Sequence, residues 1–363
     1  MIFASAQLHP PEAAGPTLLA IATDARKVVN LRNAGFQRAR VRRQTNRGTD
    51  YWTEEPVGVP KIPTNFLDGV FYLYSDRAAA EAGDKYGGTG FFVGVPCRDM
   101  PNSHYLYAVS NWHVAVQKGF SVLRVNSTDG PPEIIELGPE DWEFDPEAGH
   151  DIAVAVVTLG QARMSLVESH ALVTRDKFSG ENALGVGDDT FMVGRFVDHD
   201  GGPTNQPAAR FGHISIGPSK LRGVFNKDVD MICLDTNSRT GFSGSPVYVY
   251  RTMTSDLEAL ARPELQGQIL LIKRAGLMLL GVHTGQFPEW WAAENGPEVE
   301  SDGTEEASAG QVRGLSGMTR VAPAWGIQQL LDLPKFKAGR DAADDEYARL
   351  MNTGLAISRD GKG

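Results

Sequence analysis

Cysteine is scarce in this chain, with only Cys97 and Cys233 among 363 residues. Two cysteines in so long a chain do not make a disulfide framework, so we expect two free thiols and a reducing, cytoplasmic setting. The chain begins Met-Ile-Phe-Ala-Ser without a basic segment, so we expect no secretory signal. The alternative is an extracellular protein expressed without its signal.

Long apolar runs and an excess of positive charge are also missing. The best candidate for a membrane span, residues 269–282, is interrupted by Lys273 and Arg274, whereas a span needs about 18 uninterrupted apolar residues. Lys and Arg number 35 against 45 Asp and Glu, which gives a net charge of −10. Phosphate recognition needs a basic face, so we expect neither nucleic acid nor a membrane as a partner of the whole chain.

Glycine and proline are plentiful instead, with 40 and 21 residues. Short segments rich in β-branched or aromatic residues recur in two successive groups. The first group comprises residues 67–74, 90–95, 105–109, 121–125 and 152–159. The second comprises residues 190–197, 209–216, 229–234, 246–250, 277–283 and 318–322. Two groups of short strands with Gly-rich turns predict an all-β fold of two packed barrels.

Composition and periodicity place the domain boundaries. We assign residues 61–175 to a first barrel and residues 176–334 to a second. The second ends in a helix, because residues 325–333 carry apolar side chains at helical spacing before Pro334. Residues 335–363 are assigned to a C-terminal tail.

Two insertions interrupt the second barrel. Residues 255–268 have helical composition. Residues 294–312 hold six acidic residues and no basic one, which predicts a mobile acidic loop.

Residues 1–60 form an N-terminal extension, in which basic residues lie among few apolar ones without a clear period. The basic residues are Arg26, Lys27, Arg32, Arg38, Arg40, Arg42, Arg43 and Arg47. One interpretation is a solvated, flexible arm. The other is an electrostatic docking segment for an activating partner.

The strongest local signal is Gly241-Phe-Ser243-Gly-Ser-Pro246, followed by an apolar strand. A serine hydroxyl is a weak nucleophile at neutral pH, so it needs a base and an oxyanion hole. The flanking glycines allow a tight turn, and they let the N–H groups of Gly241 and Ser243 point at one spot. Taken alone, the pattern equally describes a Gly/Ser turn leading into a strand.

Two further signals lie at the ends of apolar strands. His113 follows Tyr-Ala-Val-Ser-Asn-Trp, and imidazole takes and returns a proton near neutrality. Asp151 opens the strand Ile-Ala-Val-Ala-Val-Val, where a charge is costly unless it is paired or hydrogen-bonded. Each residue alone is more often structural, as a packed histidine or a turn-capping aspartate.

Together these residues resemble the chymotrypsin-like serine protease superfamily, in particular standalone bacterial trypsin-like peptidases. The order His, Asp, Ser is that of the superfamily. Ser110-Asn-Trp-His113 resembles its T-A-x-H pattern, His150-Asp-Ile-Ala-Val its N-D-I-A-L, and Gly241 to Pro246 its G-D-S-G-G-P. Residues 87–93 resemble the strand that precedes the catalytic histidine, and residues 281–285 resemble the strand that flanks the primary specificity pocket. Residues 317–327 resemble the final strand that leads into the C-terminal helix. The resemblance covers about residues 66–333.

This resemblance implies a double β-barrel with a C-terminal helix and a serine endopeptidase that needs no metal or organic cofactor. Its substrate would be a protein or peptide. Ser243 would attack the peptide carbonyl, with His113 as general base and Asp151 as the acid that orients it. The N–H groups of Gly241 and Ser243 would hold the oxyanion.

Position 242 departs from the family pattern, because Phe stands where the family has an acidic residue. In zymogen-type members that acid pairs with a new N-terminal amine after cleavage. Phe242 cannot form this pair, so we expect an oxyanion loop that is preformed or is ordered by another partner.

A specificity pocket is predicted from Asn237, Ser238, His283 and Gly285. Asn237 stands where trypsin-like enzymes have the acid that binds Arg or Lys, so strong basic specificity is not expected. Gly-Val-His283-Thr-Gly285 resembles Gly-Ile-His-Trp-Gly of glutamyl endopeptidases. Those enzymes are implied to hold glutamate with this histidine and a hydroxyl, which is Ser238 here. We expect preference for Glu or Gln; the alternative is that His283 only orders its strand.

Three other functions compete with this hypothesis. The first is a catalytically silent binding module with the protease fold. The second is an unrelated serine hydrolase such as an esterase, although the α/β-hydrolase order would be Ser, acid, His. The third is a scaffold that binds a partner through the basic N-terminal residues.

Overall fold

The computed structural model describes residues 62–100, 103–128, 130–160, 162–180, 183–199, 201–202, 204–250, 277–292 and 311–352, with five strands closer to the N-terminus. The chain divides into two compact units. One comprises residues 1–63 and 250–276, the other residues 64–249 and 277–363. The predicted insertion at 255–268 lies outside the described residues, as does the predicted acidic loop up to residue 310.

Five strands are described in the first unit. They are β1 (Ala6–Leu8), β2 (Thr17–Ile21), β3 (Val28–Arg32), β4 (Arg38–Gln44) and β5 (Asp50–Pro56). Strands β1, β4 and β5 form one sheet, and β2 pairs with β3. Residues 1–60 as a whole show no clear period in their sequence. However, Arg-Ala-Arg-Val-Arg in β4 alternates basic with apolar residues, which is a period typical of a strand.

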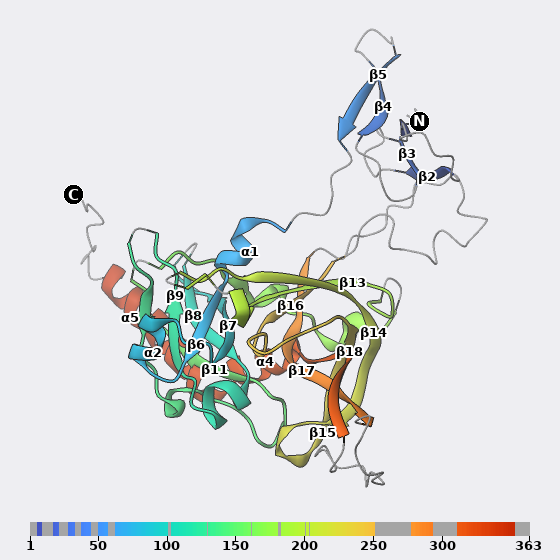
Figure 1. Cartoon of the computed structure of the whole chain (residues 1–363). Coiled ribbons are helices and arrows are strands. Elements are labelled where there is room, and N and C mark those ends of the chain that lie inside the picture. The colour runs from blue at the N-terminus through green and yellow to red at the C-terminus, as the bar shows by residue number, and fades with distance from the viewer. Residues whose placement is uncertain are drawn as a thin grey trace. The chain divides into compact units, whose positions relative to one another are not determined.

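A curled sheet of seven strands begins the second unit (Figure 1). Its strands are β6 (Val70–Tyr74), β7 (Gly88–Pro96), β8 (His104–Ser110), β9 (Val122–Val125), β10 (Glu133–Ile135), β11 (Ala153–Val156) and β12 (Val167–Glu168). The order is β10-β9-β6-β7-β8-β11, and β12 pairs with β7. Phe71, Leu73 and Phe92 are fully buried in its core, so the aromatic and branched residues that predict these strands also fill the half-barrel.

A closed barrel of six strands follows. Its strands are β13 (Asp189–Gly194), β14 (Ala208–Arg222), β15 (Asp228–Asp235), β16 (Pro246–Tyr250), β17 (Met278–Ala292) and β18 (Gln311–Pro323). The order around the barrel is β13-β14-β15-β18-β17-β16. Val193, Val247, Val282 and Val321 are fully buried. The predicted chymotrypsin-like double barrel is therefore confirmed, with a curled first sheet and a closed second one.

Among the described residues, helices and helical turns are short except at the C-terminus. The helices are α1 (Thr64–Asp68), α2 (Arg77–Ala82), α4 (Ala324–Leu331) and α5 (Pro334–Asn352). Single turns lie at His113–Gln117, Pro139–Asp141, Ser169–Ala171, Arg175–Phe178, Val197–His199 and Val224–Asn226. Within the ranges described, no helix is long and apolar enough to cross a membrane.

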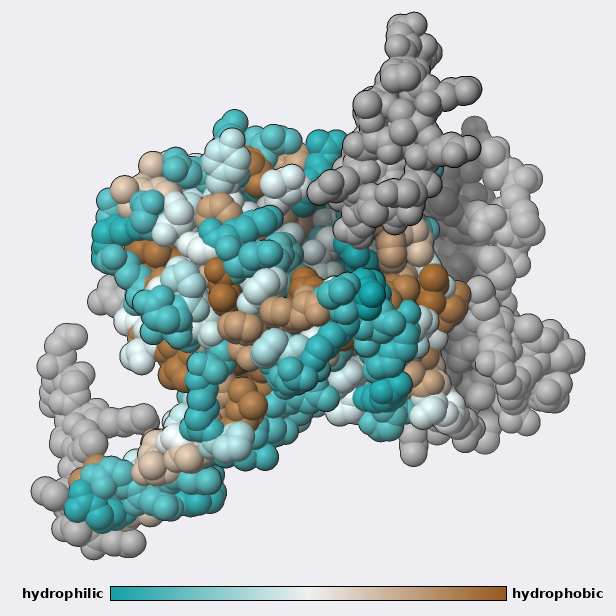
Figure 2. Space-filling model, turned by 90° about the horizontal axis from the view of Figure 1, so that it is seen from below, coloured by the Kyte–Doolittle hydropathy of each residue, from teal (hydrophilic) through white to brown (hydrophobic). Residues whose placement is uncertain are grey.

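Helix α5 occupies residues that the sequence analysis assigned to a tail. Pro334 ends α4 as predicted, but proline is also favoured at the first position of a helix, and here it begins α5. The Tyr105 hydroxyl and the Asp344 carboxylate are 2.8 Å apart, which ties α5 to β8. Figure 2 shows hydrophilic residues over most of this helix, at the lower left.

Both cysteines are free thiols. Cys233 is buried on β15, where cysteine behaves as a small hydrophobe, and Cys97 is half-buried.

Candidate active site

His113 and Asp151 are brought together by the pairing of β8 with β11, in which Ser110 lies opposite Ala153. Asp151 Oδ2 lies 2.6 Å from His113 Nδ1, and Oδ1 accepts the His113 backbone N–H at 3.0 Å. The Asn111 side-chain amide donates to the Asp151 carbonyl oxygen at 2.8 Å. A carboxylate only accepts hydrogen bonds. The contact between Asp151 Oδ2 and His113 Nδ1 therefore assigns the ring proton to Nδ1 and leaves Nε2 as the basic nitrogen.

Ser243 lies in a tight turn between β15 and β16 that requires glycine at two positions. Gly241 has φ +99°, and a Cβ there would lie 2.7 Å from the Arg195 carbonyl oxygen. Gly244 has φ +87°, and its Cβ would lie 2.0 Å from the Thr89 carbonyl oxygen. Only glycine combines positive φ with such close backbone packing, so these glycines set the shape of the turn.

The backbone amides around Ser243 divide into bonded and free groups. Phe242 N–H donates to the Arg239 carbonyl at 3.2 Å, and Ser245 N–H donates to the Phe242 carbonyl at 3.0 Å. By contrast, the N–H groups of Gly241 and Ser243 donate to no acceptor in the described part of the chain. Two free N–H groups beside a serine are what stabilisation of an oxyanion requires.

Phe242 anchors this turn in the second barrel. Its side chain is fully buried, and a Cβ on Gly194 of β13 would lie 2.9 Å from its ring. The Arg210 guanidinium lies 5.7 Å from the ring centroid. A buried apolar side chain therefore occupies the position where zymogen-type members have an acid.

No hydrogen bond joins the Ser243 hydroxyl to the His113 ring, although both residues are described. The two segments nevertheless flank Gly88, where an added Cβ would lie 3.0 Å from the Ser243 carbonyl oxygen and 2.7 Å from a Val114 methyl group. Catalytic hydrogen bonds often tighten only when substrate binds.

The residues predicted for the specificity pocket differ in exposure. Asn237 is exposed, whereas Ser238 and His283 are buried. Gly285 has φ +155°. The Gln286 side-chain amide donates to the Ser238 carbonyl oxygen, and no motif in the sequence predicts this contact. No hydrogen bond joins Ser238 to His283 in the described residues.

His283 is a buried, neutral imidazole at neutral pH. Burial lowers its pKa to about 4, with smaller effects of the backbone of Phe242, which raises it, and of His113 and Arg320, which lower it. Its backbone N–H donates to the Ser245 carbonyl, and its carbonyl accepts from Gly244 N–H. Its strand is therefore joined directly to the Ser243 turn.

The lowered pKa of His283 predicts acid sensitivity. The unfolded chain takes up a proton near pH 6.5, whereas the folded chain takes it up only near pH 4, so unfolding is favoured as the pH falls between these values. The free energy of unfolding should decrease by roughly 3 kcal/mol from this group over that range. Urea unfolding at pH 6.5 and at pH 4.5 measures this decrease. The free energy of unfolding of His283→Leu should fall less between the two pH values than that of the wild type.

A control is needed for His150, whose pKa burial also lowers. The variant His150→Asn measures how much His150 contributes to the loss of stability at low pH. An equal decrease in the wild type and in His283→Leu would contradict the assignment to His283.

Sequence reasoning missed Thr89, Ser110 and Asn111, which hold the predicted residues in place. Thr89 N–H donates to the Ser243 carbonyl at 2.8 Å, and the Ser110 hydroxyl donates to the Thr89 carbonyl at 2.7 Å. The available signal was a small polar residue between two glycines, Gly88-Thr89-Gly90, next to an apolar strand.

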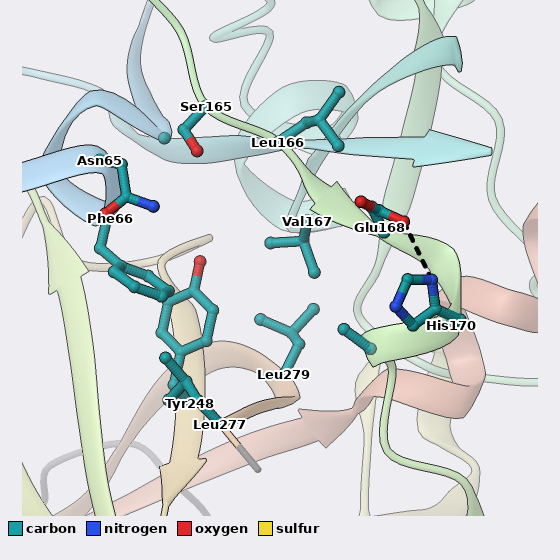
Figure 3. A pocket seen from close by; sticks show the side chains of 12 residues that line it. Asn65, Phe66, Ser165, Leu166, Val167, Glu168, His170, Tyr248, Leu277 and Leu279 are labelled. Carbon is teal, nitrogen blue, oxygen red and sulfur yellow. Dashed lines mark ion pairs between the residues drawn. The ribbon is translucent and has the colours of Figure 1, made fainter. Parts of the chain in front are cut away.

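A separate cavity of about 200 Å³ lies between α1, β12, β16 and β17. Figure 3 shows the Tyr248 hydroxyl directed into it and Glu168 paired with His170, at 3.0 Å from carboxylate to Nδ1. None of the predicted site residues lines it, and it lacks a nucleophile beside a base. The described residues also contain no cluster of His, Cys, Asp or Glu able to hold a metal ion.

The half-barrel that carries His113 and Asp151 and the closed barrel that carries Ser243 define the chymotrypsin-like double-barrel fold. No protein-family model and no curated protein matches the sequence.

The chain is similar to several solved protease structures at low identity. The MamO protease domain from Magnetospirillum magneticum is 13% identical, with 73% of this chain and 96% of that chain covered and a TM-score of 0.37. Rv3671c from M. tuberculosis H37Rv, in an inactive mutant form, is 19% identical, with 78% of this chain and 97% of that chain covered and a TM-score of 0.35. Thermobifida fusca Protease A is 12% identical, with 73% of this chain and 94% of that chain covered and a TM-score of 0.29. These values are too low to carry any of those activities over to this chain.

Proposed function

We propose that the protein is a serine endopeptidase that uses Ser243 as nucleophile, His113 as general base and Asp151 as the group that orients the base. The observation that carries the proposal is the contact between the buried Asp151 carboxylate and His113, at 2.6 Å from Oδ2 to Nδ1. It supports a role for Nε2 as proton acceptor, because the other ring nitrogen is committed to the carboxylate.

In the proposed reaction Nε2 of His113 takes the proton of Ser243 as its oxygen attacks a peptide carbonyl. The negative charge on the carbonyl oxygen is stabilised by the N–H groups of Gly241 and Ser243, whose freedom from other acceptors supports this role. The imidazolium then protonates the leaving amine, and water releases the acyl group by the same route. Buried Phe242 supports activity without pairing to a new N-terminal amine.

Digestion of a peptide library by the purified full-length chain tests the proposed function. The expected result is cleavage of internal peptide bonds, detected by mass spectrometry, with no cleavage by Ser243→Ala prepared in parallel. Equal cleavage by both proteins would assign the activity to a contaminant and would contradict the proposal.

A substrate preference follows from Ser238 and His283, which we propose as the groups that bind the side chain before the scissile bond. A neutral imidazole and a hydroxyl can each donate one hydrogen bond, to a carboxylate or a side-chain amide. A panel of peptides differing only in that residue should therefore give the highest kcat/KM with Glu or Gln. Faster cleavage after Phe, Leu or Arg would end this part of the proposal.

The second candidate function is a catalytically silent binding module. The observation that favours it is the lack of a hydrogen bond between the Ser243 hydroxyl and His113 in the described residues. Such a module would bind peptides from the library without cleaving any, and its affinity would be the same in Ser243→Ala.

A further inference from the structure

Thr89 lies on β7 and is fully buried, and every polar group it has is hydrogen-bonded. Its N–H donates to the Ser243 carbonyl at 2.8 Å, and its hydroxyl donates to the Gly241 carbonyl at 2.7 Å. The hydroxyl accepts the Arg195 N–H at 2.9 Å, and the Thr89 carbonyl accepts the Ser110 hydroxyl at 2.7 Å. One side chain and its backbone thus join four segments of the chain.

The position of Thr89 in the sheet explains why it makes these contacts. The ladder between β7 and β8 begins at Phe91 opposite Val109, two residues further along β7. At Thr89 the turn that carries Ser243 takes the place of a neighbouring strand. The fit is close, because a Cβ on Gly244 would lie 2.0 Å from the Thr89 carbonyl oxygen. The first half-barrel therefore holds the Ser243 turn through Thr89.

The bond to Gly241 acts on the peptide unit between Gly241 and Phe242. The Gly241 carbonyl belongs to the same planar peptide as the Phe242 N–H. That N–H donates to the Arg239 carbonyl at 3.2 Å, so Arg239 holds one side of the peptide and the Thr89 hydroxyl holds the other. The Thr89 hydroxyl fixes that carbonyl. The N–H groups of Gly241 and Ser243 then remain without acceptors in the described residues.

We propose that Thr89 is a positioning residue for the oxyanion site: its hydroxyl holds the Gly241 carbonyl so that the two free N–H groups keep the orientation that the transition state needs. The inference rests on the proposed function. Thr89 also connects the Ser243 turn to the strand that leads to His113. The Ser110 hydroxyl donates to the Thr89 carbonyl, and Ser110 lies on β8 three residues before His113.

The isosteric variant Thr89→Val removes the hydroxyl and keeps the shape, and Thr89→Ser keeps the hydroxyl. With a peptide substrate, Thr89→Val should lower kcat by about tenfold to a hundredfold with KM nearly unchanged, because misplaced donors act on the transition state alone. Thr89→Ser should stay close to the wild type.

A second readout separates positioning from a merely structural role. A peptide aldehyde forms a tetrahedral adduct with an oxyanion, whereas a product peptide binds without one. Thr89→Val should lose affinity for the aldehyde by the same factor as kcat and keep its affinity for the product peptide. Thr236→Val is the control, because it removes a different hydroxyl that donates to a backbone carbonyl, that of Phe211. It shows how far the melting temperature falls when one such hydrogen bond is lost.

Two results would overturn the inference while the proposed function stands. One is a Thr89→Val protein with wild-type kcat, and the other is an equal loss of affinity for the aldehyde and the product peptide. If Thr89→Val does not fold, Thr89→Ala is compared with Thr89→Ser in the same way. A wild-type chain without activity toward any peptide would overturn the proposed function and this inference with it.

Discussion

Replacing Ser243 with alanine is expected to lower kcat by about four to six orders of magnitude and to leave the fold intact. The substitution removes only the hydroxyl oxygen that would attack the substrate. The backbone contacts of the turn, from Thr89 N–H to the Ser243 carbonyl and from Gly244 N–H to the His283 carbonyl, do not involve that oxygen. Steady-state hydrolysis of the best library peptide and thermal unfolding measure the two effects.

Ser245 offers a matched control two residues away in the same turn. Its hydroxyl is buried and has no hydrogen-bond partner in the described residues, so Ser245→Ala should retain activity within about threefold. Equal losses in Ser243→Ala and Ser245→Ala would point to general disruption of the turn and would contradict a nucleophilic role for Ser243.

Replacing Asp151 with asparagine should lower kcat by about three to four orders of magnitude. Asp151 accepts two hydrogen bonds from His113, one from the backbone N–H and one from Nδ1. Asparagine has a single acceptor oxygen. If that oxygen keeps the hydrogen bond from the backbone N–H, the amide NH₂ faces Nδ1. The NH₂ group can donate a hydrogen bond to Nδ1 only when Nδ1 carries no proton. The proton then moves to Nε2, which is the nitrogen that must act as base.

The measurement for Asp151→Asn is kcat across the pH range, with thermal unfolding to show that the chain is folded. Asp141→Asn is the control, because Asp141 is an exposed carboxylate outside β11 that accepts the Gly138 N–H at 2.7 Å. A value of kcat within tenfold of the wild type in Asp151→Asn would show that the carboxylate does not set the tautomer of His113.

The sequence predicted the fold where local patterns and the final structure agree. The apolar segments 67–74 and 152–159 carry buried strands because their branched and aromatic residues fill the half-barrel. The predicted helix at 325–333 is α4. Helix α5 was missed, because a proline that ends one helix can begin the next, and the two roles have the same local signature.

The candidate site was predictable to the extent that it is carried by motifs. His113 and Asp151 were chosen for their order and neighbours, and the structure brings them into contact through the β8–β11 pairing. Thr89 could not be chosen in this way. Its partners Gly241 and Ser243 lie about 150 residues away, so its role depends on the packing of two barrels, which no local pattern encodes.

The central claim is that Ser243 is an activated nucleophile, and labelling with a fluorophosphonate probe tests it most directly. The probe reacts with a serine hydroxyl only where a base and an oxyanion site activate it. Intact mass and peptide mapping of the full-length chain should show one adduct, on Ser243, that is absent from Ser243→Ala and strongly slowed in His113→Ala. A folded wild-type chain that takes up no probe, or takes it up on a different serine, would contradict the account.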